Sequence, residues 1–218
     1  MHETPARIVL VTGGSSGTGA QIAQQLADAD THVVVHYRKS ATRAQAVADA
    51  ITRAGGRAST LRADIGEPAD SAAMLETIAA RFGRLDALVL NASVHLEPGA
   101  HPGYAMRLNR EAQRRLARAA MPLIPAGGRI VFVTDHQGHF YPHKAVPKGH
   151  TAVAASKWAG EATLYAMRSE FHRAGVHFTV VSGDTIDGSY AAAVVNAVNT
   201  ARPTGMVYVG GPEHRMTA

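Results

Sequence analysis

Runs of branched apolar residues alternate with alanine-rich segments of helical period along almost the whole chain. The first run, residues 8–11, leads into a glycine cluster and then into a helix-like stretch over residues 17–29. Continuous apolar runs are typical of strands buried on both faces, and helices between them supply the crossovers of a parallel sheet. We therefore predict a single α/β domain over residues 1–218, a doubly wound parallel Rossmann sheet of about seven strands with helices on both faces.

The order of these segments gives the predicted elements. Strands are expected at residues 8–11, 32–36, 59–61, 85–90, 129–134, 176–182 and 206–209. Helices are expected at residues 17–29, 41–54, from 68 onward, 104–123, 151–174 and 190–200. In such sheets ligands bind beyond the carboxyl ends of the strands, where the strand order reverses. The loops at that edge are therefore expected to carry the function.

Composition excludes several classes of protein. Hydrophobic residues make up 46% of the chain, which is enough for a core and argues against disorder. The sequence has no cysteine, so disulfide scaffolds, thiolate metal sites and cysteine nucleophiles are excluded. No apolar run approaches the roughly 20 residues of a membrane span, and the first residues show no signal-peptide pattern. We expect a cytoplasmic protein without a membrane partner.

The charge balance bears on the partners. The formal net charge is +5, from 22 Lys and Arg against 17 Asp and Glu. The basic residues are spread along the chain without a Lys/Arg-rich run, so we expect no nucleic-acid partner. A phosphorylated small molecule suits this charge balance.

The glycine cluster is the first candidate ligand site. Residues 12–19 read TGGSSGTG, directly after the first predicted strand and at the start of a helix. Glycines allow positive φ and close backbone approach, and the helix N-terminus offers free N–H groups to a pyrophosphate. No Lys-Ser/Thr pair follows the last glycine, which disfavours a Walker-type site. The alternative is a plain glycine-rich turn. The candidate cofactor-binding residues are Gly13, Ser15, Ser16, Gly17, Thr18 and Gly19.

The end of the second predicted strand indicates which dinucleotide binds. Proteins that bind NAD place a carboxylate there for the ribose hydroxyls, whereas this chain has Tyr37, Arg38, Lys39 and Ser40. A carboxylate would repel a 2′-phosphate, and an arginine can hold it through paired hydrogen bonds. The residues favour NADP(H) over NAD. The alternative is that both cations are solvated surface charges.

Further motifs lie at the same edge of the predicted sheet. Asp64 and Ile65 follow the third strand, the sequence Asn91-Ala92-Ser93 follows the fourth, and Asn109 lies in the long helix after it. Together with residues 12–19 and with residues 204–211 (TGMVYVGG), these motifs resemble the short-chain dehydrogenase/reductase family, in the branch that includes ketoacyl-carrier-protein reductases. The resemblance covers almost the whole chain.

The resemblance implies an oxidoreductase that uses a nicotinamide cofactor. It implies that Asn109 orders a water in the proton relay and that Lys157 binds the nicotinamide ribose. It also implies a homodimer or homotetramer that pairs through the long helices after strands four and five. The cofactor-binding residues that it adds are Asp64, Ile65, Asn91, Ala92, Ser93, Lys157 and Gly183.

The catalytic motif departs from the family pattern. Lys157 matches the lysine of Y-x-x-x-K, which puts Val153 at the tyrosine position, and Asp135 falls on the catalytic serine. Valine donates no proton, so another acid is needed if a carbonyl is reduced. Asp135, Tyr141 and His150 are the candidates, beside Asn109 and Lys157.

Plainer interpretations apply to the loop that follows the fifth predicted strand. Asp135 could merely cap a turn, and we expect His136, His139 and His143 to be solvated loop residues. Their spacing matches no common ligand pattern, so no metal site is predicted.

The loop after the sixth predicted strand also departs from the family. Residues 182–188 (SGDTIDG) lack the proline of the P-G-x-x-x-T motif, and the helical substrate lid that follows is much shortened. Three functions stay open for a small-molecule substrate. They are an NADPH-dependent carbonyl reductase with a substituted proton donor, a non-redox dehydratase, isomerase or cyclase, and a silent NADP(H)-binding protein.

Overall fold

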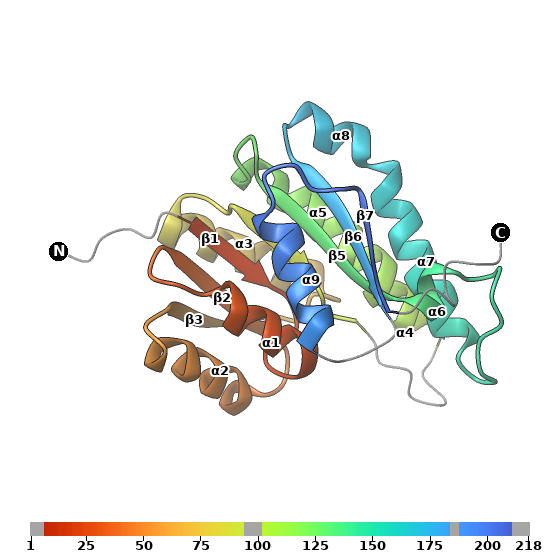
Figure 1. The fold of residues 1–218 in the computed structure, drawn as a ribbon, viewed down its shortest axis with the longest axis horizontal. Coiled ribbons are helices and arrows are strands. Elements are labelled where there is room, and N and C mark those ends of the chain that lie inside the picture. Colours follow the sequence, from red (N-terminus) through yellow and green to blue (C-terminus); the bar gives the residue numbers. More distant parts are fainter. Residues whose placement is uncertain (1–6, 94–101, 184–187, 211–218) are drawn as a thin grey trace.

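A computed structural model of the chain describes residues 7–93, 102–183 and 188–210. Its strands form one seven-stranded parallel sheet in the order β3-β2-β1-β4-β5-β6-β7 (Figure 1). The strands are β1 (Arg7–Val11), β2 (Thr31–Tyr37), β3 (Arg57–Arg62), β4 (Ala87–Leu90), β5 (Arg129–Asp135), β6 (His177–Gly183) and β7 (Met206–Val209). The predicted fold class is confirmed.

Helices cover both faces of this sheet (Figure 1). They are α1 (Gly17–Leu26), α2 (Ala41–Arg53), α3 (Pro68–Phe82), α4 (Pro102–Met106), the π-helical η1 (Arg107–Ala112), α5 (Gln113–Ala120), the 3₁₀ turn η2 (Met121–Leu123), α6 (His136–His139), α7 (Thr151–Ala166), α8 (Arg168–Arg173) and α9 (Gly188–Asn199). Alternate residues of each strand point to opposite faces. Val9 and Val11 accordingly pack with α1, α2 and α9, whereas Ile8 and Leu10 pack with α3, α5 and α7.

The strand order reverses at β1. Val9 pairs with Val33 of β2 on one side and with Ala87 of β4 on the other. The chain therefore runs outward from β1 in both directions, and a crevice opens at the carboxyl ends of β1 and β4. The glycine loop leaves β1 at this point.

Two predicted helices are interrupted. The helix expected over residues 104–123 consists of α4, η1, α5 and η2, and the helix expected over 151–174 breaks at Met167 between α7 and α8. Single π-helical turns are frequent at functional sites, and η1 contains Asn109. A Cβ at Gly160 would lie 2.0 Å from the backbone oxygen of Asn109, so only glycine allows α7 to approach η1 this closely.

Part of the predicted substrate loop lies outside the described residues. Gly183 ends β6, and α9 begins at Gly188. Residues 184–187, on which the prediction of a shortened lid rests, and Gly211 of the terminal motif are outside the described ranges.

Candidate functional site

A cavity of about 1080 Å³ lies at the carboxyl ends of the strands. Its walls come from the glycine loop, the ends of β2, β4, β5 and β6, and the helices α4, α6, α7 and α9. All the residues predicted to bind a cofactor line it: Gly13, Ser15, Ser16, Gly17, Thr18, Gly19, Tyr37, Arg38, Lys39, Ser40, Asp64, Ile65, Asn91, Ala92, Ser93, Lys157 and Gly183.

The glycine loop has a shape that larger residues could not adopt. Gly13 and Gly17 have φ values of 66° and 53°, in the left-handed region that favours glycine. A Cβ at Gly19 would lie 2.3 Å from the backbone oxygen of Gly13 and 2.5 Å from Nδ2 of Asn91. The Asn91 amide in turn donates to the Thr12 oxygen at 2.9 Å. The loop is therefore folded tightly against the end of β4 and leaves its outer side open to a ligand.

A buried histidine holds the same loop from the side of β2. The backbone N–H of Gly13 donates to Nδ1 of His36 at 3.0 Å, and Nε2 of His36 lies 3.0 Å from the Ala63 oxygen. This pattern requires a neutral ring with its proton on Nε2. Burial lowers the pKa of His36 to about 4, which keeps the ring neutral at pH 7. Sequence analysis did not find this role, and the only signal was a polar residue in an apolar strand.

Cations gather at the end of the cavity formed by β2 and β3. Among the described residues, Arg38, Lys39, Arg43 and Arg62 line this end, and Asp64 supplies the one carboxylate there. The nearest oxygen of Asp64 is 3.8 Å from Nη1 of Arg38, and both side chains are about one third exposed. Four cations facing one anion leave an excess of positive charge, which suits a phosphate dianion.

The opposite end of the cavity contains an ion pair. Nζ of Lys157 lies 2.5 Å from Oδ2 of Asp135, while Oδ1 of Asp135 accepts the Gly138 N–H at 2.7 Å and caps α6. A Cβ at Gly138 would lie 2.6 Å from Cβ of Lys157, so the glycine lets α6 approach α7. Asp135 therefore both caps a helix and pairs with the lysine.

Other polar groups surround this ion pair. The hydroxyl of Tyr190 donates to the Thr134 oxygen, and burial raises the pKa of Tyr190 well above its usual value. Oγ1 of Thr134 and Oε1 of Gln137 are buried without a hydrogen-bond partner among the described residues. Both residues line the cavity, so a ligand in the cavity is a candidate partner for these atoms.

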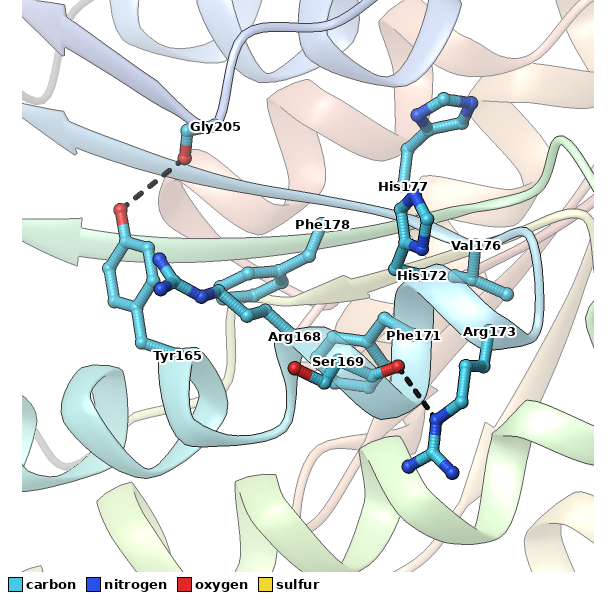
Figure 2. Close-up of a pocket in the computed structure, with 10 residues that line it drawn as sticks. All are labelled: Tyr165, Arg168, Ser169, Phe171, His172, Arg173, Val176, His177, Phe178 and Gly205. Carbon is cyan, nitrogen blue, oxygen red and sulfur yellow. Dashed lines mark hydrogen bonds between the residues drawn. The ribbon is translucent and has the colours of Figure 1, made fainter.

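A second cavity, of about 570 Å³, lies elsewhere on the molecule (Figure 2). It is formed by the end of α7, by α8 and by the start of β6, where the Tyr165 hydroxyl reaches the Gly205 oxygen at 3.5 Å. It shares no lining residue with the first cavity and has no glycine loop. The first cavity is therefore the candidate functional site.

Comparison with known proteins agrees with this geometry. The sequence profile described as short chain dehydrogenase matches residues 7–198. The chain belongs to the short-chain dehydrogenase family. It is 35% identical over 167 residues to a probable tetrahydroxynaphthalene reductase of Zymoseptoria tritici, an alignment that covers 74% of this chain and 61% of that relative.

Solved structures of two reductases resemble the described fold. A promiscuous reductase that catalyses keto-reduction at C1 during lugdunomycin biosynthesis superposes with a TM-score of 0.84 at 26% identity, covering 99% of this chain and 100% of that one. An angucycline C-6 ketoreductase with bound NADP superposes with a TM-score of 0.79 at 26% identity, covering 94% of both chains.

The remaining catalytic candidates lie apart from the cavity lining. Asn109 is buried in η1, and its Nδ2 donates to Oγ of Ser156 at 2.9 Å. His150 precedes α7 as its N-cap residue, and neither His150 nor Tyr141 lines the cavity. Val153 is buried within α7. The structure thus brings Asp135 and Lys157 together at the cavity, but not Tyr141 or His150.

Two histidines that we expected to be solvated are held inside the protein, so that expectation is wrong for them. His136 is 4% exposed, and its Nδ1 lies 2.8 Å from Oγ of Ser182. Nδ1 of His139 lies 2.8 Å from the buried carboxylate of Glu161, and its Nε2 lies 3.0 Å from the Tyr208 hydroxyl. The short helix α6 causes the difference, because it turns both rings inward. His143 is exposed, as expected.

Sequence analysis missed several residues that line the cavity. They are His36, Arg43, Arg62, Tyr104, Leu108, Val133, Thr134, Gln137 and Tyr190. Arg43 and Arg62 had a detectable signal, because both lie next to loops already assigned to the site. Tyr104 and Tyr190 had none, since helix packing alone places them there.

Two further searches covered the described residues. No three His, Asp or Glu side chains in this part of the chain gather as metal ligands would. None of its helices combines the length and the hydropathy needed to cross a membrane.

Proposed function

We propose that the chain is an NADP(H)-dependent reductase that converts a carbonyl group of a small molecule into an alcohol. The observation that carries this proposal is a single cavity with a glycine loop and four cations at one end and the Asp135–Lys157 pair at the other. Both structural relatives described above are named as keto-reducing enzymes, and one of them holds NADP. These likenesses support the proposal.

Each part of the cofactor has a matching set of residues. The loop from Gly13 to Gly19 would hold the pyrophosphate at the start of α1, and Arg38 with its neighbouring cations would hold the 2′-phosphate. Asp64 and Ile65 would lie beside the adenine, and Asn91, Lys157 and Gly183 beside the nicotinamide and its ribose. The bound cofactor supplies the hydride.

Lys157 is the proton donor in this proposal. Val153, at the tyrosine position of the family motif, has no proton to give. The Asp135 carboxylate pairs with the Lys157 ammonium, so the exchangeable protons of the pair lie on Nζ. As the carbonyl accepts the hydride, a proton from Nζ would pass to its oxygen, and solvent would then reprotonate the amine. Asp135 holds the ammonium in place.

The test is NADPH oxidation with a panel of polyhydroxylated aromatic ketones, the substrate class suggested by the relatives' names. We expect turnover by the unchanged chain and a loss of about 100-fold or more in Lys157→Met, within the range for a removed general acid. NADPH affinity, measured by fluorescence titration, should fall by less, because Lys157 would contact only the nicotinamide ribose while the glycine loop and Arg38 would hold the phosphates. Lys157→Arg keeps the charge but donates poorly, so it should bind NADPH and stay slow.

Two other outcomes would replace the proposal. Product formation without NADPH consumption would indicate the non-redox dehydratase, isomerase or cyclase, which the close Asp135–Lys157 pair also favours as an acid and a base. NADPH binding without any turnover of the panel would favour the silent, cofactor-binding protein.

We also propose that the chain forms a homodimer or homotetramer through α5 and α7. Trp158 of α7 is 44% exposed and supplies an apolar side chain for such an interface. Light scattering after size-exclusion chromatography measures the mass directly. A Trp158→Glu variant should shift the mass toward the monomer, and a monomeric unchanged chain would contradict the proposal.

A further inference from the structure

Tyr104 lies at the cationic end of the cavity but comes from a different part of the chain. It belongs to α4, whereas Arg38 follows β2. Its hydroxyl accepts a hydrogen bond from Nη1 of Arg38, and the Arg38 guanidinium carbon lies 5.8 Å from the centre of its ring. The guanidinium carbon of Arg107 lies 5.5 Å from the same ring. One phenol is therefore in contact with two cations.

The phenol orients Arg38 without neutralising it. A guanidinium has five N–H donors, and a neutral hydroxyl takes up one while the full positive charge remains. The competing partner is Asp64, whose nearest oxygen is 3.8 Å from the same nitrogen and beyond hydrogen-bond distance. A closer contact with Asp64 would reduce the positive charge offered to an anion.

We propose that Tyr104 is a positioning residue that sets the preference for NADPH over NADH by holding Arg38 toward the 2′-phosphate. This inference rests on the assignment of Arg38 to the 2′-phosphate made under the proposed function. It requires no catalytic step, because the preference is a property of binding. The exposed guanidinium of Arg107, over the same ring, adds positive charge near Tyr104.

The first test removes only the hydroxyl. In Tyr104→Phe, NADPH should bind about tenfold more weakly, the size expected when one hydrogen bond to a charged group is lost, and NADH should stay within twofold. Fluorescence titration gives both dissociation constants. Tyr165→Phe is the matched control, because its hydroxyl lies at the second cavity (Figure 2) and its loss should change neither constant.

A double-mutant cycle tests whether Tyr104 acts through Arg38. Arg38→Met should remove most of the preference for NADPH, and adding Tyr104→Phe to it should have no further effect. Adenosine 2′,5′-bisphosphate and adenosine 5′-phosphate, each used as a competitor of NADPH, differ only in the 2′-phosphate. The difference between their affinities should show the same pattern across the variants. This cycle uses binding alone, so it is independent of whether any carbonyl is reduced.

The outcomes separate the inference from its premise. If Arg38→Met keeps the preference for NADPH, the assignment of Arg38 is wrong and the inference falls with it. A second case is that Arg38→Met removes the preference for NADPH. Tyr104 is then not the positioning residue if Tyr104→Phe leaves both affinities unchanged or lowers the affinities for NADPH and NADH equally. The same holds if its effect on NADPH affinity adds to that of Arg38→Met. Thermal melting of each variant shows whether it is folded. If Tyr104→Phe is not folded, Tyr104→His, which keeps a ring and a polar atom, takes its place.

Discussion

The two ends of the cavity differ in how their charges are balanced. Among the described residues, four cations face one carboxylate at the end formed by β2 and β3, whereas at the other end the ammonium of Lys157 is matched by the carboxylate of Asp135 at 2.5 Å. The first end therefore has an excess of positive charge that can bind an anionic ligand. At the second end, the charges of Lys157 and Asp135 neutralise each other. This end therefore offers a substrate protons and hydrogen bonds rather than a net charge.

The end that contains the Asp135–Lys157 pair, called the balanced end below, is also joined to α7 by a second pair. Asp135 and His139 are four residues apart, as are Lys157 and Glu161, so the pairs Asp135–Lys157 and His139–Glu161 form two successive bridges to α7. Tyr208 of β7 extends the second bridge through Nε2 of His139. Under the proposed function, we therefore expect that cofactor affinity and proton transfer can be altered separately.

The largest expected effect is at the glycine loop. Gly19→Ala would place a Cβ 2.3 Å from the Gly13 oxygen, so the loop must open. NADPH binding should weaken by about 100-fold or more, because close backbone approach to the pyrophosphate is lost. Fluorescence titration measures the effect. Gly205→Ala is the control, since a Cβ there meets nothing within 4 Å. Unchanged binding in Gly19→Ala would contradict the cofactor site itself.

A smaller effect is expected at the balanced end. Asp135→Asn keeps the shape of the side chain but removes the charge that holds Lys157. We expect carbonyl reduction to slow by about 10- to 100-fold, because a misplaced acid loses much of the contribution of general acid catalysis. NADPH affinity should stay within about threefold. Glu170→Gln, which breaks the exposed Arg118–Glu170 pair, is the charge-matched control. Equal losses of affinity and turnover would mean that the two ends are not separable.

The sequence could predict individual residues of the site better than the contacts between them. The alternation of strands and helices, the glycine loop and Arg38 follow from local patterns, because a glycine cluster between a strand and a helix has few other uses. The bridge from His139 to Glu161 and the contact from Tyr104 to Arg38 join residues far apart in the chain. No periodicity encodes such contacts, since they depend on how helices are placed over the sheet.

The last prediction concerns pH and the glycine loop. His36 is neutral in the folded chain, with a pKa of about 4 against 6.5 in the unfolded chain. The unfolded chain therefore binds more protons between pH 6.5 and 4, so stability falls as the pH drops through this range. From pH 7.5 to 5.5 the contribution of His36 amounts to about 1 kcal/mol.

Denaturant unfolding of the unchanged chain and of His36→Gln at both pH values isolates this contribution. The variant should lose less stability on acidification by about that amount, since glutamine does not titrate. His32, whose pKa is also lowered to about 4, lies away from the loop, with its Nε2 at 2.8 Å from Oγ of Ser59. His32→Gln should flatten the pH dependence of stability to a smaller degree, because the His32 ring is only partly buried and solvent screens its charge, and it should leave NADPH affinity intact. His36→Gln should weaken NADPH binding as well, because the glutamine amide lies near the Nε2 position of histidine and not at the Nδ1 position that accepts from the Gly13 N–H. If both variants bind NADPH like the unchanged chain, His36 stabilises the fold without shaping the cofactor loop.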